Sequence, residues 1–191
     1  MTWKEVPQVD QNGFITAYEV LYEPLDTFND FLNISVMNVT AVEFSVVLTN
    51  LQEFVTYSII VRAYTSIGPG PYSDAVYEMT LEDSPGSPPV NVTVYLSSAT
   101  SVVVNWQEVP PIHQNGIITL YEVICEPLEV PDRDLDLETL TMIQYTSNQS
   151  VYLSDLEGFV TYSISVRAFT AVGVGPYSVP QVTTTLEDGE L

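Results

Sequence analysis

Two long blocks of the sequence each occur twice, and this internal repeat restricts the fold more than any other feature. Residues 3–25 return 103 positions later as residues 106–128, with most side chains unchanged. Residues 51–73 return 105 positions later as residues 156–178. The change of offset places a two-residue insertion between the blocks, where a loop tolerates it best. The 191-residue chain is therefore predicted to hold two homologous domains, each of an ordinary domain size.

Each repeat alternates apolar and polar residues with a period of two, which is typical of strands with one buried face. In the second repeat the side chains predicted to point inward are Val92, Val94, Val102, Val104, Trp106, Tyr121, Val123, Cys125, Tyr162, Ile164, Val166 and Ala168. Residues 114–116 and 172–176 supply the Gly, Asn and Pro that tight reversals need. Several short strands at this spacing predict an all-β sandwich.

The order of these motifs resembles the fibronectin type III domain. The resemblance rests on the Pro89–Val94 motif, the alternation up to Trp106, the segment from Gly116 to Val123, and the Gly173–Ser178 motif. It implies two tandem immunoglobulin-like, seven-stranded β-sandwiches without disulfides.

The resemblance also implies which residues build the structural core. Trp106 would fill the centre of the second domain, as Trp3 would in the first. The hydroxyl of Tyr162 would tie the turn after Leu156 in a tyrosine corner. Tyr57 and Leu51 would do the same in the first domain.

The first domain is predicted to lack its N-terminal strand or strands. Trp3 is the third residue, whereas residues 88–105 precede its counterpart Trp106. We therefore expect a truncated domain over 1–83, a Pro/Ser/Gly linker over 84–89, and a complete domain over 90–188. The first should be less stable and expose a strand edge. We also expect the natural protein to be longer at both ends.

Charge limits the partners that the chain can bind. The sequence has 25 acidic and four basic residues, a formal net charge of −21. Nucleic acid and heparin are not expected partners, because binding them requires clustered Lys and Arg. An unidentified protein ligand with a basic surface fits better. No run of 18 apolar residues occurs, so contact with a membrane is expected only through regions outside this chain.

Four Asn-x-Ser/Thr sequons are candidates for N-glycosylation, at Asn33, Asn38, Asn91 and Asn148. About two would arise by chance in a chain of this composition. The alternation places Asn33 and Asn91 on outward faces, as a glycan requires. Together with the resemblance, the sequons predict an extracellular or cell-surface location.

No group of residues predicts catalysis, a cofactor or a metal site, so the chain is not expected to be an enzyme. His113 lies in a predicted loop, without the partners that a general base needs. Cys125 takes the inward position of Tyr22 and is expected to be a buried, inert thiol. The acidic run over 132–138 lacks the glycine and the final glutamate of an EF-hand, and it is expected to be a solvated strand.

The sequence supports three hypotheses for function. The first is a set of protein-binding and spacer modules in the ectodomain of a cell adhesion or guidance receptor, or of a receptor-type tyrosine phosphatase. The second is an intracellular structural array of the muscle or cytoskeletal type. The third is an accessory module of a secreted enzyme. The sandwich itself does not identify a ligand, because it hosts many unrelated functions.

Overall fold

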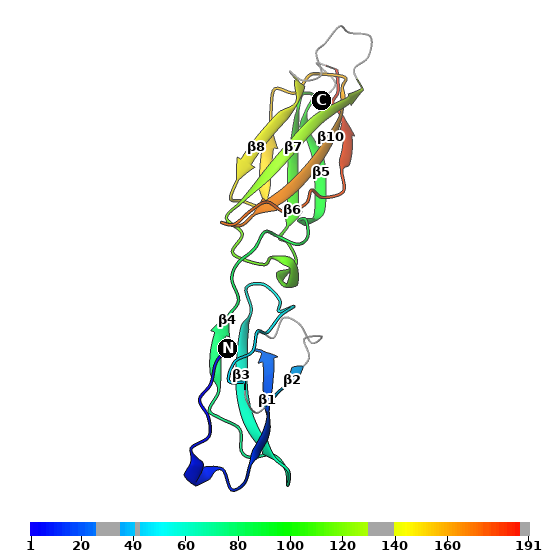
Figure 1. Cartoon of the computed structure of the whole chain (residues 1–191). Helices are drawn as coiled ribbons and strands as arrows, with labels where there is room; N and C mark the ends of the chain where they lie inside the picture. Colours follow the sequence, from blue (N-terminus) through cyan, green and yellow to red (C-terminus); the bar gives the residue numbers. More distant parts are fainter. Residues whose placement is uncertain (26–34, 41–42, 130–139, 188–191) are drawn as a thin grey trace. The chain divides into compact units, whose positions relative to one another are not determined.

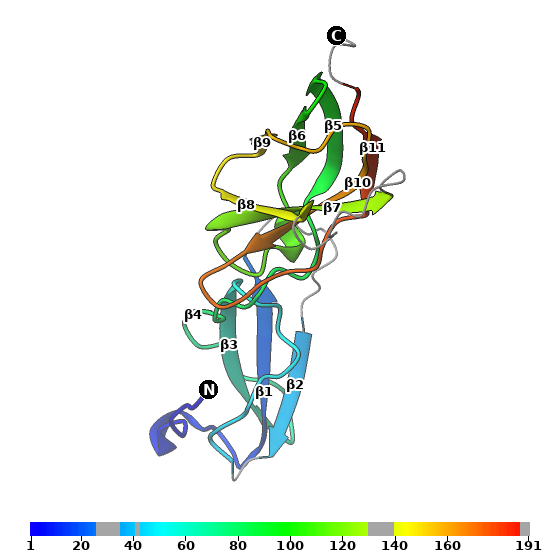
Figure 2. The same ribbon diagram turned by 90° about the horizontal axis from the view of Figure 1, so that it is seen from above.

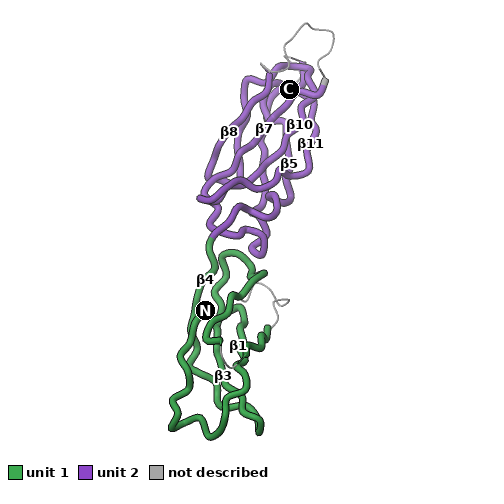
Figure 3. Tube along the Cα trace, viewed as in Figure 1, with its two compact units in different colours: residues 1–81 green, residues 82–191 purple. Residues whose placement is uncertain are grey.

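The structure is a computed structural model that describes residues 1–25, 35–40, 43–129 and 140–187. The chain divides into two compact units, unit 1 over Met1–Leu81 and unit 2 over Glu82–Leu191 (Figure 3). In the described residues, no helix has the length and apolar character that crossing a bilayer demands.

Unit 2 is a sandwich of two antiparallel sheets (Figures 1 and 2). Its strands are β5 (Val90–Ser98), β6 (Ser101–Gln107), β7 (Leu120–Glu129), β8 (Met142–Thr146), β9 (Ser150–Leu153), β10 (Thr161–Phe169) and β11 (Gln181–Thr184). One sheet has the order β11-β10-β7-β8 and the other the order β5-β6-β9. A short 3-10 helix, Pro111–His113, precedes β7. The predicted seven-stranded sandwich is confirmed for this unit.

The core of unit 2 fills the space between its two sheets. Alternate residues of β6, β7 and β10 point into it, since successive side chains of a strand face opposite sides. Val104, Val123 and Ile164 are fully buried, and Trp106 is 4% exposed. The Trp106 ring meets Tyr121 edge-on at a centroid distance of 5.4 Å. Val92 and Val94 of β5 cover this core from one side.

Unit 1 has one complete sheet, of the order β2-β1-β3-β4. Its strands are β1 (Ile15–Pro24), β2 (Ser35–Thr40), β3 (Thr56–Thr65) and β4 (Val76–Met79). A 3-10 helix, Gln8–Asp10, precedes β1. Of a second sheet, the described residues of unit 1 contain a bridge between Thr2 and Ser45, beside which Trp3 N donates to Phe44 O at 3.0 Å. In the described part of unit 1, no strand stands where β5 lies in unit 2.

The core of unit 1 is consequently more open. Six of its described hydrophobic residues are buried, whereas the core cluster of unit 2 has fifteen. Trp3, Val6 and Leu51 are only partly buried, while their counterparts in unit 2 are less than 5% exposed. The two units share most of their core sequence, so the difference follows from the cover that β5 provides in unit 2, which has no counterpart in the described part of unit 1.

Candidate functional site

Three of the four sequon asparagines lie within the described residues, and all three are exposed. Asn38 is on β2, an edge strand of unit 1. Asn91 is near the start of β5, and Asn148 is in the turn between β8 and β9. Asn33 lies outside the described residues. The three described side chains are accessible for modification.

The backbone at Asn91 turns this side chain away from the sandwich. Asn91 has a left-handed φ of 53°, and the β5–β6 register shifts between Val90 and Thr93, which marks a bulge. The side-chain nitrogen donates to Gln107 Oε1 at 2.7 Å. A glycan on this nitrogen would replace one of its two hydrogens and leave the other for the bond to Gln107.

The outer face of the β5-β6-β9 sheet carries a cross-strand row of apolar side chains. Val103 pairs with Tyr95 on one side and with Tyr152 on the other. Both tyrosines are more than half exposed. Tyrosine is enriched in protein interfaces because its ring buries apolar area while its hydroxyl can still form hydrogen bonds. This row is therefore a candidate contact surface.

Both units contain the hydrogen bond of a tyrosine corner. Glu157 N donates to the hydroxyl of Tyr162 at 3.0 Å, and Gln52 N donates to that of Tyr57 at the same distance. Tyr162 is fully buried and Tyr57 is 5% exposed. Each bond ties the loop that precedes a central strand to that strand.

Replacing Tyr162 with phenylalanine is expected to destabilise unit 2 by about 1 kcal/mol, because it removes one hydrogen bond and keeps the ring. A change of this size lowers the melting temperature of a domain of about 100 residues by about 4–8 °C. Calorimetry of the full chain would measure the shift. Tyr57→Phe is the matched control and should lower only the transition of unit 1. A shift of the same transition by both variants would contradict the prediction.

A carboxylate, a guanidinium and tyrosines meet on the outer face of the four-stranded sheet of unit 2. Glu122 of β7 pairs in register with Arg167 of β10. The Arg167 Nε and Nη2 atoms donate to Glu122 Oε1 and Oε2 at 2.7 and 3.1 Å. Tyr177 also donates to this carboxylate, and its ring centroid lies 4.4 Å from the guanidinium carbon. We name these three residues, with their unit 1 counterparts below, the Glu–Arg–Tyr clusters.

Unit 1 repeats this arrangement with Glu19, Arg62 and Tyr72. Arg62 Nε donates to Glu19 Oε1 at 2.7 Å, and the Tyr72 hydroxyl donates to the same atom at 2.8 Å. Tyr64 adds a hydrogen bond of 2.9 Å to Glu19 Oε2. Phe169 takes the place of Tyr64 in unit 2, where the hydroxyl of Tyr145 interacts with Glu122 instead.

Both carboxylates are held in the ionised form. Burial alone raises the pKa of Glu122, but hydrogen bonds from Arg167, Tyr177 and Tyr145 outweigh it, so the pKa lies below its ordinary value. The pKa of Glu19 is lowered, mainly by the hydrogen bond from Arg62 and then by that from Tyr72. A carboxylate with a lowered pKa and a permanent ion-pair partner is a poor proton acceptor. The clusters are therefore structural clamps between strands.

The residues of the Glu–Arg–Tyr clusters belong to the repeated motifs, but they are not among the site residues predicted from the sequence. Arg62 and Arg167 are two of only four cations in the chain, and they occupy equivalent positions. The return of a rare basic residue at the same position of both repeats is the sequence signal that points to the clusters.

The other candidates from the sequence do not form a reactive site within the described residues. His113 is exposed at the end of the second 3-10 helix. Cys125 is fully buried, and burial raises the pKa of its thiol to about 12, so it is protonated at neutral pH. No group of three His, Cys, Asp or Glu side chains in the described residues could hold a metal ion. The acidic run over 132–138 lies outside the described residues.

The chain is similar to cell-surface proteins over nearly its whole length. It is 33% identical over 189 residues to the cell adhesion molecule DSCAML1 of Homo sapiens, covering 98% of this chain and 9% of that protein. It is 30% identical to protein sidekick-2 of Mus musculus, covering 98% of this chain and 8% of that one. It is 35% identical to receptor-type tyrosine-protein phosphatase F of Mus musculus, and the match covers 97% of this chain and 10% of that protein. The chain thus spans about a tenth of the length of these relatives.

A solved structure and a family model match the same region. The solved structure, the FN1-FN3 domains of chicken CNTN1, has 24% identity and a TM-score of 0.47, and the match covers 97% of this chain and 61% of that one. The model of the fibronectin type III domain matches residues 1–79 and again residues 87–184. The two residue ranges that the family model matches correspond to the two units. The chain belongs to the fibronectin type III domain family, of which it carries two modules.

Proposed function

We propose that the two modules serve as non-catalytic spacer and protein-binding modules in the extracellular part of a cell-surface protein. One observation carries this proposal: every sequon asparagine among the described residues is exposed, on modules whose relatives include cell adhesion molecules. A glycosylated, exposed module surface fits a protein that passes through the secretory route. The row formed by Tyr95, Val103 and Tyr152 offers an apolar contact surface for a protein partner.

Glycan occupancy tests the location. The chain, expressed behind a secretory signal in animal cells, is expected to carry N-glycans at Asn38, Asn91 and Asn148. Treatment with an endoglycosidase should reduce its mass, and each Asn→Gln variant should remove one glycan. Peptide mapping of the secreted protein would assign the sites.

Gln8→Asn is a matched control because it adds an exposed asparagine without creating a sequon. Its mass before and after endoglycosidase should equal that of the parent chain apart from the substitution. A secreted, folded chain with no glycan at any sequon would contradict the extracellular placement and favour an intracellular structural array.

A further inference from the structure

The Glu–Arg–Tyr cluster of unit 1 is less covered than that of unit 2. The side chain of Glu19 is 12% exposed, whereas that of Glu122 is 2% exposed. In unit 2 the edge strand β8 places Tyr145 in register with Glu122. The Tyr145 hydroxyl forms a hydrogen bond with this carboxylate. A tyrosine of the edge strand thus covers the cluster of unit 2.

Asn38 takes the place of Tyr145 in unit 1. It lies on the edge strand β2 and pairs in register with Glu19, as Tyr145 does with the counterpart of Glu19. Thr40 belongs to the same sequon, and Val39 between the two residues faces the core. Asn38 and Thr40 are therefore on the outer face, where both are exposed. The position of an aromatic ring in unit 2 holds a glycosylation sequon in unit 1.

A second difference between the units leaves space beside the cluster. Ala17 pairs with Thr40 on one side and with Tyr64 on the other. Its counterpart in unit 2 is Leu120, which pairs with Phe169. The smaller side chain of alanine leaves room on the outer face between the edge strand and the Tyr64 ring.

The ring of Tyr64 is placed like that of its counterpart, Phe169. The Arg62 guanidinium carbon lies 5.2 Å from the Tyr64 ring centroid, and the Arg167 guanidinium carbon lies 5.5 Å from the Phe169 centroid. Phe169 also contacts the Tyr145 ring, edge to face at a centroid distance of 6.3 Å. A ring that projects from the edge strand can therefore reach this position while the arginine stays in place.

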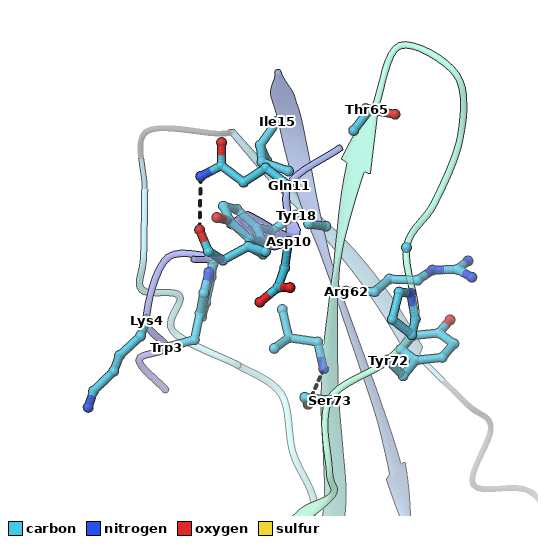
Figure 4. Close-up of a pocket in the computed structure, with 15 residues that line it drawn as sticks. Trp3, Lys4, Asp10, Gln11, Ile15, Tyr18, Arg62, Thr65, Tyr72 and Ser73 are labelled. Atoms are coloured by element: carbon cyan, nitrogen blue, oxygen red, sulfur yellow. Dashed lines mark hydrogen bonds between the residues drawn. The ribbon is translucent and has the colours of Figure 1, made fainter. Parts of the chain in front are cut away.

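The chemistry of the unit 1 cluster suits a sugar ring. A pyranose presents C–H groups on its face, which the negative face of an aromatic ring attracts, and N–H and O–H donors at its edge. Among the described residues, Glu19 Oε2 accepts one hydrogen bond, from Tyr64 at 2.9 Å, and a carboxylate oxygen can accept two. The Tyr72 ring centroid lies 4.4 Å from the Arg62 guanidinium carbon and helps to hold this arginine in place (Figure 4).

We propose that the first N-acetylglucosamine of an N-glycan on Asn38 packs on the Glu–Arg–Tyr cluster of unit 1. The sugar lies over Ala17 against the Tyr64 ring and donates a hydrogen bond to Glu19 Oε2. It takes the place that Tyr145 has in unit 2, and it stabilises unit 1. The inference rests on the proposed function, since it requires glycosylation of Asn38 in the secretory route.

Two forms of the full chain test this contact. Both carry Asn33→Gln, Asn91→Gln and Asn148→Gln, so that only the sequon at Asn38 remains. One form is secreted from animal cells and trimmed with an endoglycosidase that leaves a single N-acetylglucosamine, and the other is made in bacteria without the sugar. Calorimetry is expected to show that the sugar raises the transition of unit 1 by about 4 °C, the effect of one aromatic contact. The transition of unit 2 should be the same in both forms.

NMR spectra of the trimmed form give a readout that does not depend on stability. Nuclear Overhauser contacts are expected between the C–H protons of the sugar and the ring protons of Tyr64. The same sugar protons should shift upfield, because they lie over an aromatic ring.

Variants compared with and without the sugar make the test specific, since the effect of the substitution itself on stability then cancels. Tyr64→Leu removes the ring and should remove most of the gain. Ala17→Leu places the residue of unit 2 in the space of the sugar and should do the same. Tyr77→Leu is the matched control, because Tyr77 is 60% exposed on β4 at the opposite edge of the sheet, and it should keep the full gain.

The inference is overturned if the sugar leaves the transition of unit 1 unmoved, or if Tyr64→Leu gains as much from the sugar as the parent chain does. Either result leaves the proposed function standing, because Asn38 then still carries its glycan. Glycans at Asn91 and Asn148 with none at Asn38 in the parent chain would also overturn the inference alone. A secreted chain without any glycan contradicts the proposed function, and the inference fails with it.

Discussion

The full chain is expected to unfold in two steps on heating, with unit 1 melting at least about 10 °C below unit 2. Burying a large apolar side chain contributes about 1.5–3 kcal/mol, and several core positions that are buried in unit 2 are only partly buried in unit 1. A deficit of a few kcal/mol in a domain of this size moves the melting temperature by more than 10 °C. Calorimetry of the full chain would show two transitions.

A matched pair of variants assigns the transitions. Leu156→Ala should lower the upper transition strongly, because Leu156 is 4% exposed and leucine truncation in a core costs about 2–5 kcal/mol. Leu51→Ala should lower the lower transition by less, since Leu51 is only partly buried. Placing residues 82–105 ahead of Trp3, instead of Met1 and Thr2, should raise the lower transition toward the upper one.

A single cooperative transition, or a graft that leaves the lower transition unmoved, would contradict this account. An upward shift of the lower transition would show that the added residues cover the core of unit 1.

Replacing Glu122 with glutamine is expected to destabilise unit 2 by about 2–3 kcal/mol at neutral pH. Breaking a buried ion pair costs about 3–5 kcal/mol because the remaining charge loses its partner. We take a smaller value because the Arg167 side chain is 27% exposed and water can compensate part of its charge. Denaturant unfolding at pH 7 would measure the loss of free energy.

The loss is expected to depend on pH in a defined direction. Folding lowers the pKa of Glu122 below its ordinary value of 4.5, so the unfolded chain binds a proton more readily than the folded chain. The stability that this carboxylate contributes is complete above that ordinary value. It is lost as the pH falls through the lower pKa of the folded state. The difference between the parent chain and Glu122→Gln should therefore shrink as the pH falls from 5 to 3.

Glu19→Gln is the matched control in unit 1. It removes the equivalent carboxylate and should lower only the transition of that unit. A destabilisation by Glu122→Gln that is as large at pH 3 as at pH 7 would show that the lost hydrogen-bond acceptor, and not the charge, accounts for the effect.

The repeat made much of the fold predictable from the sequence. The period-two alternation identified the inward residues of β6, β7 and β10, because in a strand the facing of a side chain depends only on its position along the chain. The same patterns predicted a sandwich, and the resemblance to the fibronectin type III domain implied its seven strands.

The Glu–Arg–Tyr clusters could not be predicted in this way. Glu122 and Arg167 lie 45 residues apart, and Tyr177 lies 55 residues from Glu122. Only the register of β7 against β10 brings the first two together. A one-dimensional pattern contains no information on this register beyond the choice of face.

The sequence by itself determined that there are two homologous sandwiches and which residues face their cores. These properties are local or come from comparison of the two repeats. Only the tertiary structure decided that residues 82–89 pack on unit 2 and that Glu122, Arg167 and Tyr177 meet on one sheet. The reason is that these contacts join residues far apart in the sequence, and only the folded chain brings them together.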